Sequence, residues 1–116
     1  MQLDGPSLER LQHFVEERLH EVIPVRELAA EANMSVTGFH RWFKDAVGAT
    51  PQQWVISQRV ARARRLLEST EATVEQVAQH AGFGTSTNLR QHFKRVVGTT
   101  PTAYRAAFDH RLATSV

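Results

Sequence analysis

The spacing of apolar residues predicts helices along nearly the whole chain. In the first segment, an apolar side chain recurs every three or four residues, at Leu8, Leu11, Phe14, Val15 and Leu19. This period is typical of an amphipathic helix with one buried face. We expect this helix to begin at Pro6-Ser7 and to run to about His20. Pro24 then begins a short helix over residues 25–32.

Capping residues mark a third helix. Residues 33–35 are expected to form a turn, after which Ser35 caps a helix that Gly48 ends in a left-handed conformation. The apolar face of this helix consists of Phe39, Trp42, Phe43 and Val47. We interpret both tryptophans of the chain, Trp42 and Trp54, as core anchors.

A long central helix is predicted from Thr50-Pro51 to about Ser69. Thr50 and Gln53 have the spacing of a capping box, and proline is tolerated in a first turn, where its missing donor leaves no bond unmade. Its apolar stripe consists of Ile56, Val60, Ala63 and Leu67, and a second stripe of Arg59, Arg62 and Arg65.

The remaining sequence carries the same signals. Residues 73–76 predict a capping box for a fifth helix, residues 82–84 (Gly-Phe-Gly) a turn, and Thr85 or Ser86 the start of a sixth helix that ends at Gly98. A seventh helix should begin at Thr100-Pro101, fade after Phe108 and leave a frayed tail. The sequence therefore predicts an all-α fold of seven helices.

The chain contains an internal repeat. Residues 43–51 recur as residues 93–101, at an offset of fifty, and residues 25–32 resemble residues 74–81 at an offset of forty-nine, so one residue was gained between the blocks. Each copy has the order of a helix-turn-helix: a short alanine-containing helix, a tight turn, and a second helix with one aromatic and one polar face. The expected organisation is a first helix-turn-helix subdomain (6–50), a linker helix (51–69), a second subdomain (70–108) and a tail (109–116).

Composition narrows the function classes. A chain of 116 residues has room for one compact domain or two very small ones, but not for an elaborate active-site scaffold. It contains no cysteine, which fits a reducing cytosol and leaves no disulfide framework. The first residues show neither a basic start nor an apolar run, so no secretory leader is expected, and no apolar run reaches membrane-spanning length. We expect a cytoplasmic protein without membrane association.

Charges are segregated although the net charge is only +2. Residues 1–35 carry seven acids and three bases, residues 36–67 six bases and one acid, residues 68–83 three acids, and residues 84–108 four bases and no acid. Such blocks are often only solvated faces. Here the positive segments follow each predicted turn, which indicates a polyanionic partner.

The polar faces of the third and sixth helices carry residue types that read DNA. Arginine binds guanine edges, glutamine suits adenine, and small hydroxyl or methyl groups meet thymine or phosphate. The outward residues are Val36, Thr37, His40, Arg41 and Lys44 on the third helix, and Ser86, Thr87, Arg90, Gln91 and Lys94 on the sixth. A central helix of 19 residues is about 28 Å long. Because successive major grooves lie about 34 Å apart, helices 36–47 and 85–97 are predicted to enter adjacent grooves of one non-palindromic site of about 20 bp.

Three segments resemble the DNA-binding domain of the AraC/XylS transcriptional regulators: Arg59–Leu67, Val77–Phe83 and Leu89–Arg105. The resemblance extends over about residues 8–108. It implies a bipartite, homeodomain-like domain whose base contacts map to Thr37, His40, Arg41, Ser86, Thr87, Arg90 and Gln91. Val36 is included among the predicted base contacts because it lies on the outward face of the third helix. The backbone contacts are expected from Ser35, Lys44, Arg59, Arg62, Thr85, Lys94 and Arg95.

The chain departs from the family pattern at two places. Family members often have an aromatic residue in place of Leu89 and an arginine in place of Gln91, which leaves open whether Arg90 or Gln91 reads a base. The family resemblance also implies promoter or operator DNA, RNA polymerase and an N-terminal effector domain as partners. Residues 88–93 resemble members whose partner domain is like a class I glutamine amidotransferase. We expect a fragment of such a bacterial activator, with a small standalone regulator as the alternative.

Other function classes fit the sequence less well. None of the six histidines forms an HExxH motif, so no metal or cofactor is expected. Neither a GxSxG motif nor a glycine-rich phosphate loop is present, so no enzyme activity is expected. The alternative class is a helical protein-interaction module, which would require apolar outer faces on the third and sixth helices.

Overall fold

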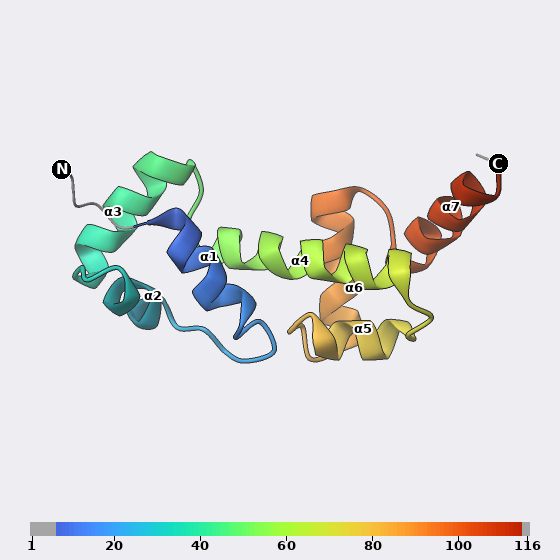
Figure 1. Ribbon diagram of the computed structural model, residues 1–116, viewed down its shortest axis with the longest axis horizontal. Helices are drawn as coiled ribbons and strands as arrows, with labels where there is room; N and C mark the ends of the chain where they lie inside the picture. The colour runs from blue at the N-terminus through green and yellow to red at the C-terminus, as the bar shows by residue number, and fades with distance from the viewer. Residues whose placement is uncertain (1–6, 115–116) are drawn as a thin grey trace. The chain divides into compact units, whose positions relative to one another are not determined.

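A computed structural model describes residues 7–114 of the protein, with side chains to residue 110. Seven helices and no strand occur in this part of the chain, which confirms the all-α fold (Figure 1). Their bounds are α1 Leu8–Glu16, α2 Val25–Glu31, α3 Val36–Val47, α4 Pro51–Ser69, α5 Val74–His80, α6 Ser86–Val97 and α7 Pro101–Thr114.

The predicted capping signals are present in the structure. The amide of Gln53 donates to the hydroxyl of Thr50, and the amide of Thr50 donates to the side chain of Gln53, both at 3.1 Å. The same reciprocal pair joins Thr73 and Gln76 at the start of α5. At the opposite end of a helix, Gly48 adopts φ 83° after α3, a left-handed conformation that a side chain would strain. The local sequence therefore defines most helix ends.

Two helix ends differ from the expectation. The first helix was expected to reach about His20, but α1 ends at Glu16 and is followed by turns. In these turns the Arg18 amide donates to the carbonyl of Val15 at 2.9 Å, and the Arg18 guanidinium donates to the carbonyl of Phe14 at 3.1 Å. These bonds replace the next helical ones. The seventh helix was expected to fade after Phe108, but α7 continues to Thr114 through a sequence without glycine or proline.

The chain divides into two compact units at Val55–Ile56, within α4. The core of the first unit is formed by α1, α2, α3 and the first turn of α4. Phe43 is fully buried at its centre, and its ring meets the ring of Trp54 edge-on, with centroids 5.3 Å apart. Trp42 is half-buried and lies 6.1 Å from the Phe43 ring. Both tryptophans therefore pack against this core, as expected.

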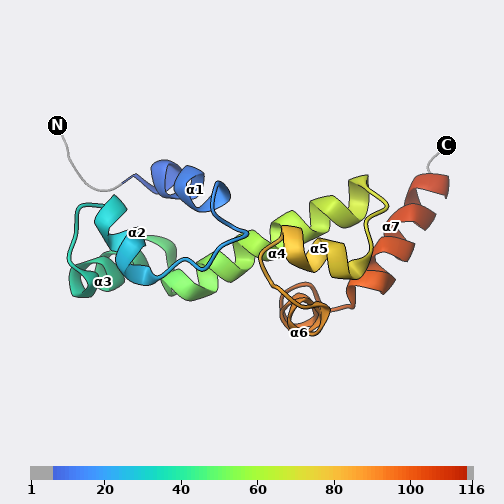
Figure 2. The ribbon, with the colours of Figure 1, turned by 90° about the horizontal axis from the view of Figure 1, so that it is seen from below.

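The second unit repeats this arrangement. Its core is formed by α5, α6, α7 and the rest of α4, including the predicted stripe of Ile56, Val60, Ala63 and Leu67. Phe93, the counterpart of Phe43, is fully buried and meets Tyr104 edge-on at 5.6 Å. Figure 2 shows α6 nearly end-on, with α5 beside it. One packing scheme thus serves both copies of the repeat.

A single arginine from α7 covers the carboxyl end of α4. The guanidinium of Arg105 donates to the carbonyls of Leu67, Ala72 and Thr70 at 3.1, 2.7 and 3.1 Å. The last carbonyls of a helix have no partner within the helix, and a cation near them is favourable. Arg105 therefore ties α7 to the segment between α4 and α5.

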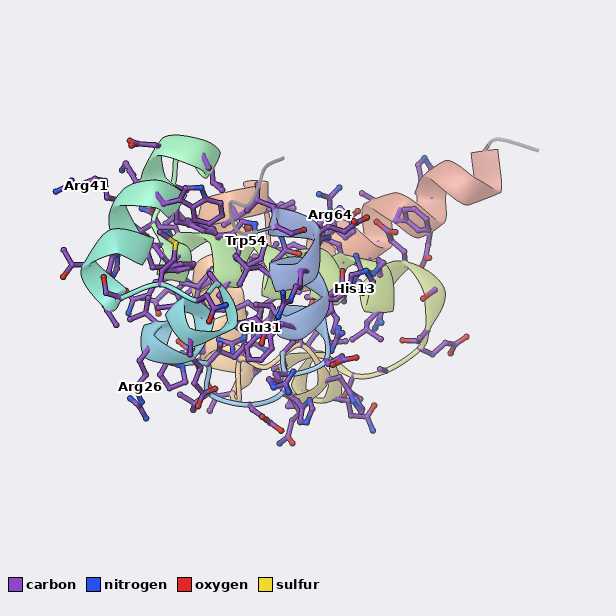
Figure 3. The ribbon with its side chains drawn as sticks, turned by 60° about the vertical axis from the view of Figure 1, so that its left-hand side comes forward. His13, Arg26, Glu31, Arg41, Trp54 and Arg64 are labelled. Atoms are coloured by element: carbon purple, nitrogen blue, oxygen red, sulfur yellow. The ribbon has the colours of Figure 1, made fainter. Side chains whose placement is uncertain are left out.

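Replacing Arg105 by alanine should destabilise the protein by about 2 kcal/mol, because three carbonyls lose a charged donor. Urea unfolding followed by circular dichroism measures this change as a lower midpoint at an unchanged slope. Arg26→Ala is the matched control, since Arg26 is an exposed arginine on α2 that points away from the protein (Figure 3). The control should stay within about 0.5 kcal/mol of the parent. Equal losses in both variants would contradict the capping role.

Candidate nucleic-acid interface

The same turn leads into α3 and α6. In the first unit the Met34 amide donates to the carbonyl of Ala29 at 2.9 Å, and in the second the Phe83 amide donates to the carbonyl of Ala78 at 2.8 Å. Asn33 takes the left-handed position of this turn with φ 60°. Both bonds close a helix end in the way of a Schellman motif. Each unit therefore has the short helix, tight turn and second helix of a helix-turn-helix.

The second unit adds one residue to this turn. Gly82, the counterpart of Asn33, has φ 88°, and Gly84 follows with φ 81°. The offset between the two copies changes from forty-nine to fifty at this place. Gly84 is therefore the residue gained by the second copy, and its left-handed backbone joins the turn to the N-cap Thr85.

The outward face of α3 is exposed. Phe39 and Phe43 are fully buried, and they fix which side of the helix meets solvent. At about 100° per residue, Arg41 lies roughly opposite these two side chains, and His40 lies on one flank. Figure 3 shows Arg41 extending away from α3. The exposed predicted residues of this helix are Val36, Thr37, His40, Arg41 and Lys44.

The outward face of α6 has the same register. Leu89 and Phe93 are buried, Gln91 lies roughly opposite them, and Arg90 lies on the flank, above Ser86. The exposed predicted residues are Thr85, Thr87, Arg90, Gln91, Lys94 and Arg95, whereas Ser86 is half-buried. The predicted base readers of each unit thus share one helix face.

Two hydrogen bonds orient arginines on α6. Nη1 of Arg90 donates to Oγ of Ser86 at 3.1 Å. On the opposite flank, Nη2 of Arg95 lies 2.8 Å from Nδ1 of His92, a distance at which it donates to the neutral ring. Sequence reasoning missed both pairs, although their spacings of four and three residues place them side by side on a helix.

The pKa of His92 is lowered from its ordinary value. The main cause is partial burial, because the imidazole stacks on the ring of Phe83 with centroids 5.7 Å apart. The positive charge of Arg95 is the second cause. His92 is therefore neutral at pH 7 and able to accept from Arg95.

The predicted backbone contacts that carry positive charge fall into two groups. Lys44, Lys94 and Arg95 are exposed on the recognition helices. Arg59 and Arg62 lie instead on α4, where both are half-buried, and burial lowers the pKa of Arg59 from its ordinary value.

Two of the predicted backbone contacts, Ser35 and Thr85, are N-cap residues whose hydroxyls already accept a hydrogen bond within the protein. Ser35 accepts from the Gly38 amide at 3.1 Å, and Thr85 accepts from the Asn88 amide at 3.2 Å. Each hydroxyl retains its proton as a donor for a phosphate oxygen. Both residues also sit at helix N-termini, where anions are favoured.

Residues 28–107 match the helix-turn-helix domain family, which is more than half of the chain. The chain belongs to the AraC-type helix-turn-helix domains. The AraC-type fold is shared with the DNA-binding domain of the global transcriptional factor AdpA, which was solved with a target DNA. That domain is 44% identical, with a TM-score of 0.84, and the likeness covers 93% of this chain and 96% of that one.

Two curated relatives are described as a probable transcriptional regulator and a transcriptional activator. The probable transcriptional regulator LumQ of Photobacterium leiognathi is 33% identical over 110 residues, which cover 90% of this chain and 44% of LumQ. The transcriptional activator NphR of Rhodococcus sp is 34% identical over 100 residues, which cover 85% of this chain and 30% of NphR. This chain therefore spans less than half the length of these relatives.

Within residues 7–114, no helix is long and apolar enough to cross a membrane.

His92 should titrate below its ordinary pKa of about 6.5. Nuclear magnetic resonance of the imidazole measures this midpoint, and Arg95→Gln should raise it part of the way because burial remains. The sign for stability follows: between the folded and unfolded pKa values the unfolded chain binds more protons, so stability falls as the pH drops below about 6.5 and then levels off. Arg26→Gln, in the other unit, should leave the midpoint unchanged. A midpoint at or above the unfolded value would contradict the contact.

Proposed function

We propose that this AraC-type domain binds double-stranded DNA in a sequence-specific way and regulates transcription. The single observation that supports this most directly is the exposed polar face on the second helix of both helix-turn-helix units. On these faces cationic, amide and hydroxyl groups stand over fully buried apolar residues. Such a face offers hydrogen-bond donors and acceptors to base edges and positive charge to phosphates. A protein-interaction module would instead need apolar outer faces.

In this proposal α3 and α6 enter adjacent major grooves of one site of about 20 bp. The continuous α4 supports it, because a helix of 19 residues is about 28 Å long and neighbouring grooves lie about 34 Å apart. The side chains proposed to meet bases are Val36, Thr37, His40, Arg41, Ser86, Thr87, Arg90 and Gln91. Those proposed to meet the backbone are Ser35, Lys44, Arg59, Arg62, Thr85, Lys94 and Arg95.

The remaining parts of the proposal concern the whole protein. The chain spans less than half the length of LumQ and NphR. We propose that an N-terminal effector domain precedes it, of the kind that resembles a glutamine amidotransferase. The description of NphR as a transcriptional activator supports activation. We further propose RNA polymerase as a partner and the bacterial cytoplasm as the location.

Selection of bound duplexes from a random pool, followed by sequencing, tests the proposed function. It also distinguishes residues that contact bases from residues that contact phosphates. The parent should enrich one non-palindromic motif. Arg41→Ala should lose about 1–3 kcal/mol on that motif and relax the preference at one or two bases, because a bidentate base contact is removed. Lys94→Ala should weaken binding to all sequences alike, because a phosphate contact carries no sequence information.

Arg26→Ala provides the control for loss of an exposed charge outside the recognition helices. Its motif and affinity should match those of the parent at equal salt. Absence of any enriched motif in the parent would contradict sequence-specific binding. A uniform loss in Arg41→Ala would contradict the assignment of Arg41 alone.

The spacing of the two half-sites tests α4 as a rigid connection. Inserting about 5 bp between them rotates the second groove to the far side of the duplex. Affinity should then fall to that of one unit with its backbone contacts. An insertion of about 10 bp restores the face but not the distance, and should also weaken binding. Footprints that keep both half-sites protected at full affinity would show a flexible connection.

A further inference from the structure

The first turn of α6 differs from that of α3 in one contact. Oγ of Ser86 accepts from Nη1 of Arg90 at 3.1 Å, across one helical turn. The positions that correspond in the first unit are Val36 and His40. Valine has no acceptor, so α3 cannot form this bond. The contact is therefore specific to the second unit, although the two helices share register and packing.

The hydroxyl of Ser86 accepts this bond because a neighbour performs the capping. Thr85 is the N-cap of α6, and its hydroxyl accepts from the Asn88 amide. Ser86 is then the first helical residue, and it is half-buried while Arg90 is exposed. The short, half-buried Ser86 side chain has few rotamers, so its hydroxyl restricts the exposed Arg90 side chain more than a long, flexible acceptor would.

The bond leaves most of the guanidinium available. Arginine has five N–H donors, and one of them meets Ser86. A neutral acceptor also leaves the positive charge uncompensated, and residues 84–108 contain no acid that would cancel it. Arg90 therefore keeps both the charge and the paired donors that a guanine edge or a phosphate requires.

We propose that Ser86 is a positioning residue that orients Arg90 toward DNA, and that this role replaces the direct base contact assigned to Ser86 above. This inference rests on the proposed function. An exposed arginine loses rotamer freedom when it binds, and restricting it beforehand reduces that loss. The second unit then reads its half-site with a partly ordered arginine, whereas His40 in the first unit lacks such a support.

Random-duplex selection with five proteins and one control variant tests this proposal. The five are the parent, Ser86→Ala, Ser86→Thr, Arg90→Ala and the double variant of Ser86→Ala with Arg90→Ala. Ser86→Ala should reduce discrimination roughly threefold, about the worth of a modest hydrogen bond, at the same base positions that Arg90→Ala affects. Ser86→Thr retains the hydroxyl and should retain the preference. In the Arg90→Ala background, Ser86→Ala should add nothing. Ser69→Ala, which removes an exposed hydroxyl at the end of α4, should bind as the parent does.

Three outcomes would overturn the positioning role while leaving DNA recognition intact. They are an unchanged preference in Ser86→Ala, a loss that is equal for all sequences, and a loss that persists in the Arg90→Ala background. The last would assign Ser86 a direct contact. Thermal unfolding of each variant shows whether a uniform loss reflects folding. If the parent itself enriches no motif, the proposed function fails, and the inference fails with it.

Discussion

Burial of one phenylalanine in each unit determines which residues of α3 and α6 face a partner. Phe43 and Phe93 are fully buried on the inner side of α3 and α6, and each meets an aromatic ring from the following helix edge-on. An aromatic side chain buries a large apolar area, so turning either helix about its axis would expose that area to water. The rotation is therefore fixed, and with it the set of residues that faces outward.

This constraint explains why so much of the fold was predictable. A buried ring imposes a three- and four-residue apolar period, which is visible in the sequence, and helix ends follow from local groups such as the capping box at Thr73–Gln76. The exposed faces of α3 and α6 follow from the same period. The end of α1, which differs from the prediction, has a different origin. The Arg18 side chain donates to a backbone carbonyl there, and apolar periodicity does not encode such a bond.

Contacts between distant segments were not predictable either, because periodicity does not encode individual side-chain hydrogen bonds. Arg105 joins α7 to carbonyls between Leu67 and Ala72, and the hydroxyl of Tyr104 donates to Glu68 and accepts from Arg64. These bonds depend on how the helices pack, and a sequence pattern specifies only which face is buried. The pairs Ser86–Arg90 and His92–Arg95 were accessible in principle, because each lies within one helical turn. What the spacing alone lacks is the rotamer that closes the bond.

The two copies of the repeat thus preserve the buried helix face and differ on the exposed one. The difference on the exposed face is one of charge. Both arginines that α6 holds in place are held by neutral acceptors, a hydroxyl and an imidazole. A carboxylate would hold an arginine more firmly, but it would cancel the charge that attracts phosphates and releases counterions. At the position of Arg95, α3 carries Asp45. The second unit therefore concentrates positive charge on its recognition helix, whereas the first mixes charges around Arg41. In the proposed two-part site, we expect the two half-sites to contribute unequally to affinity.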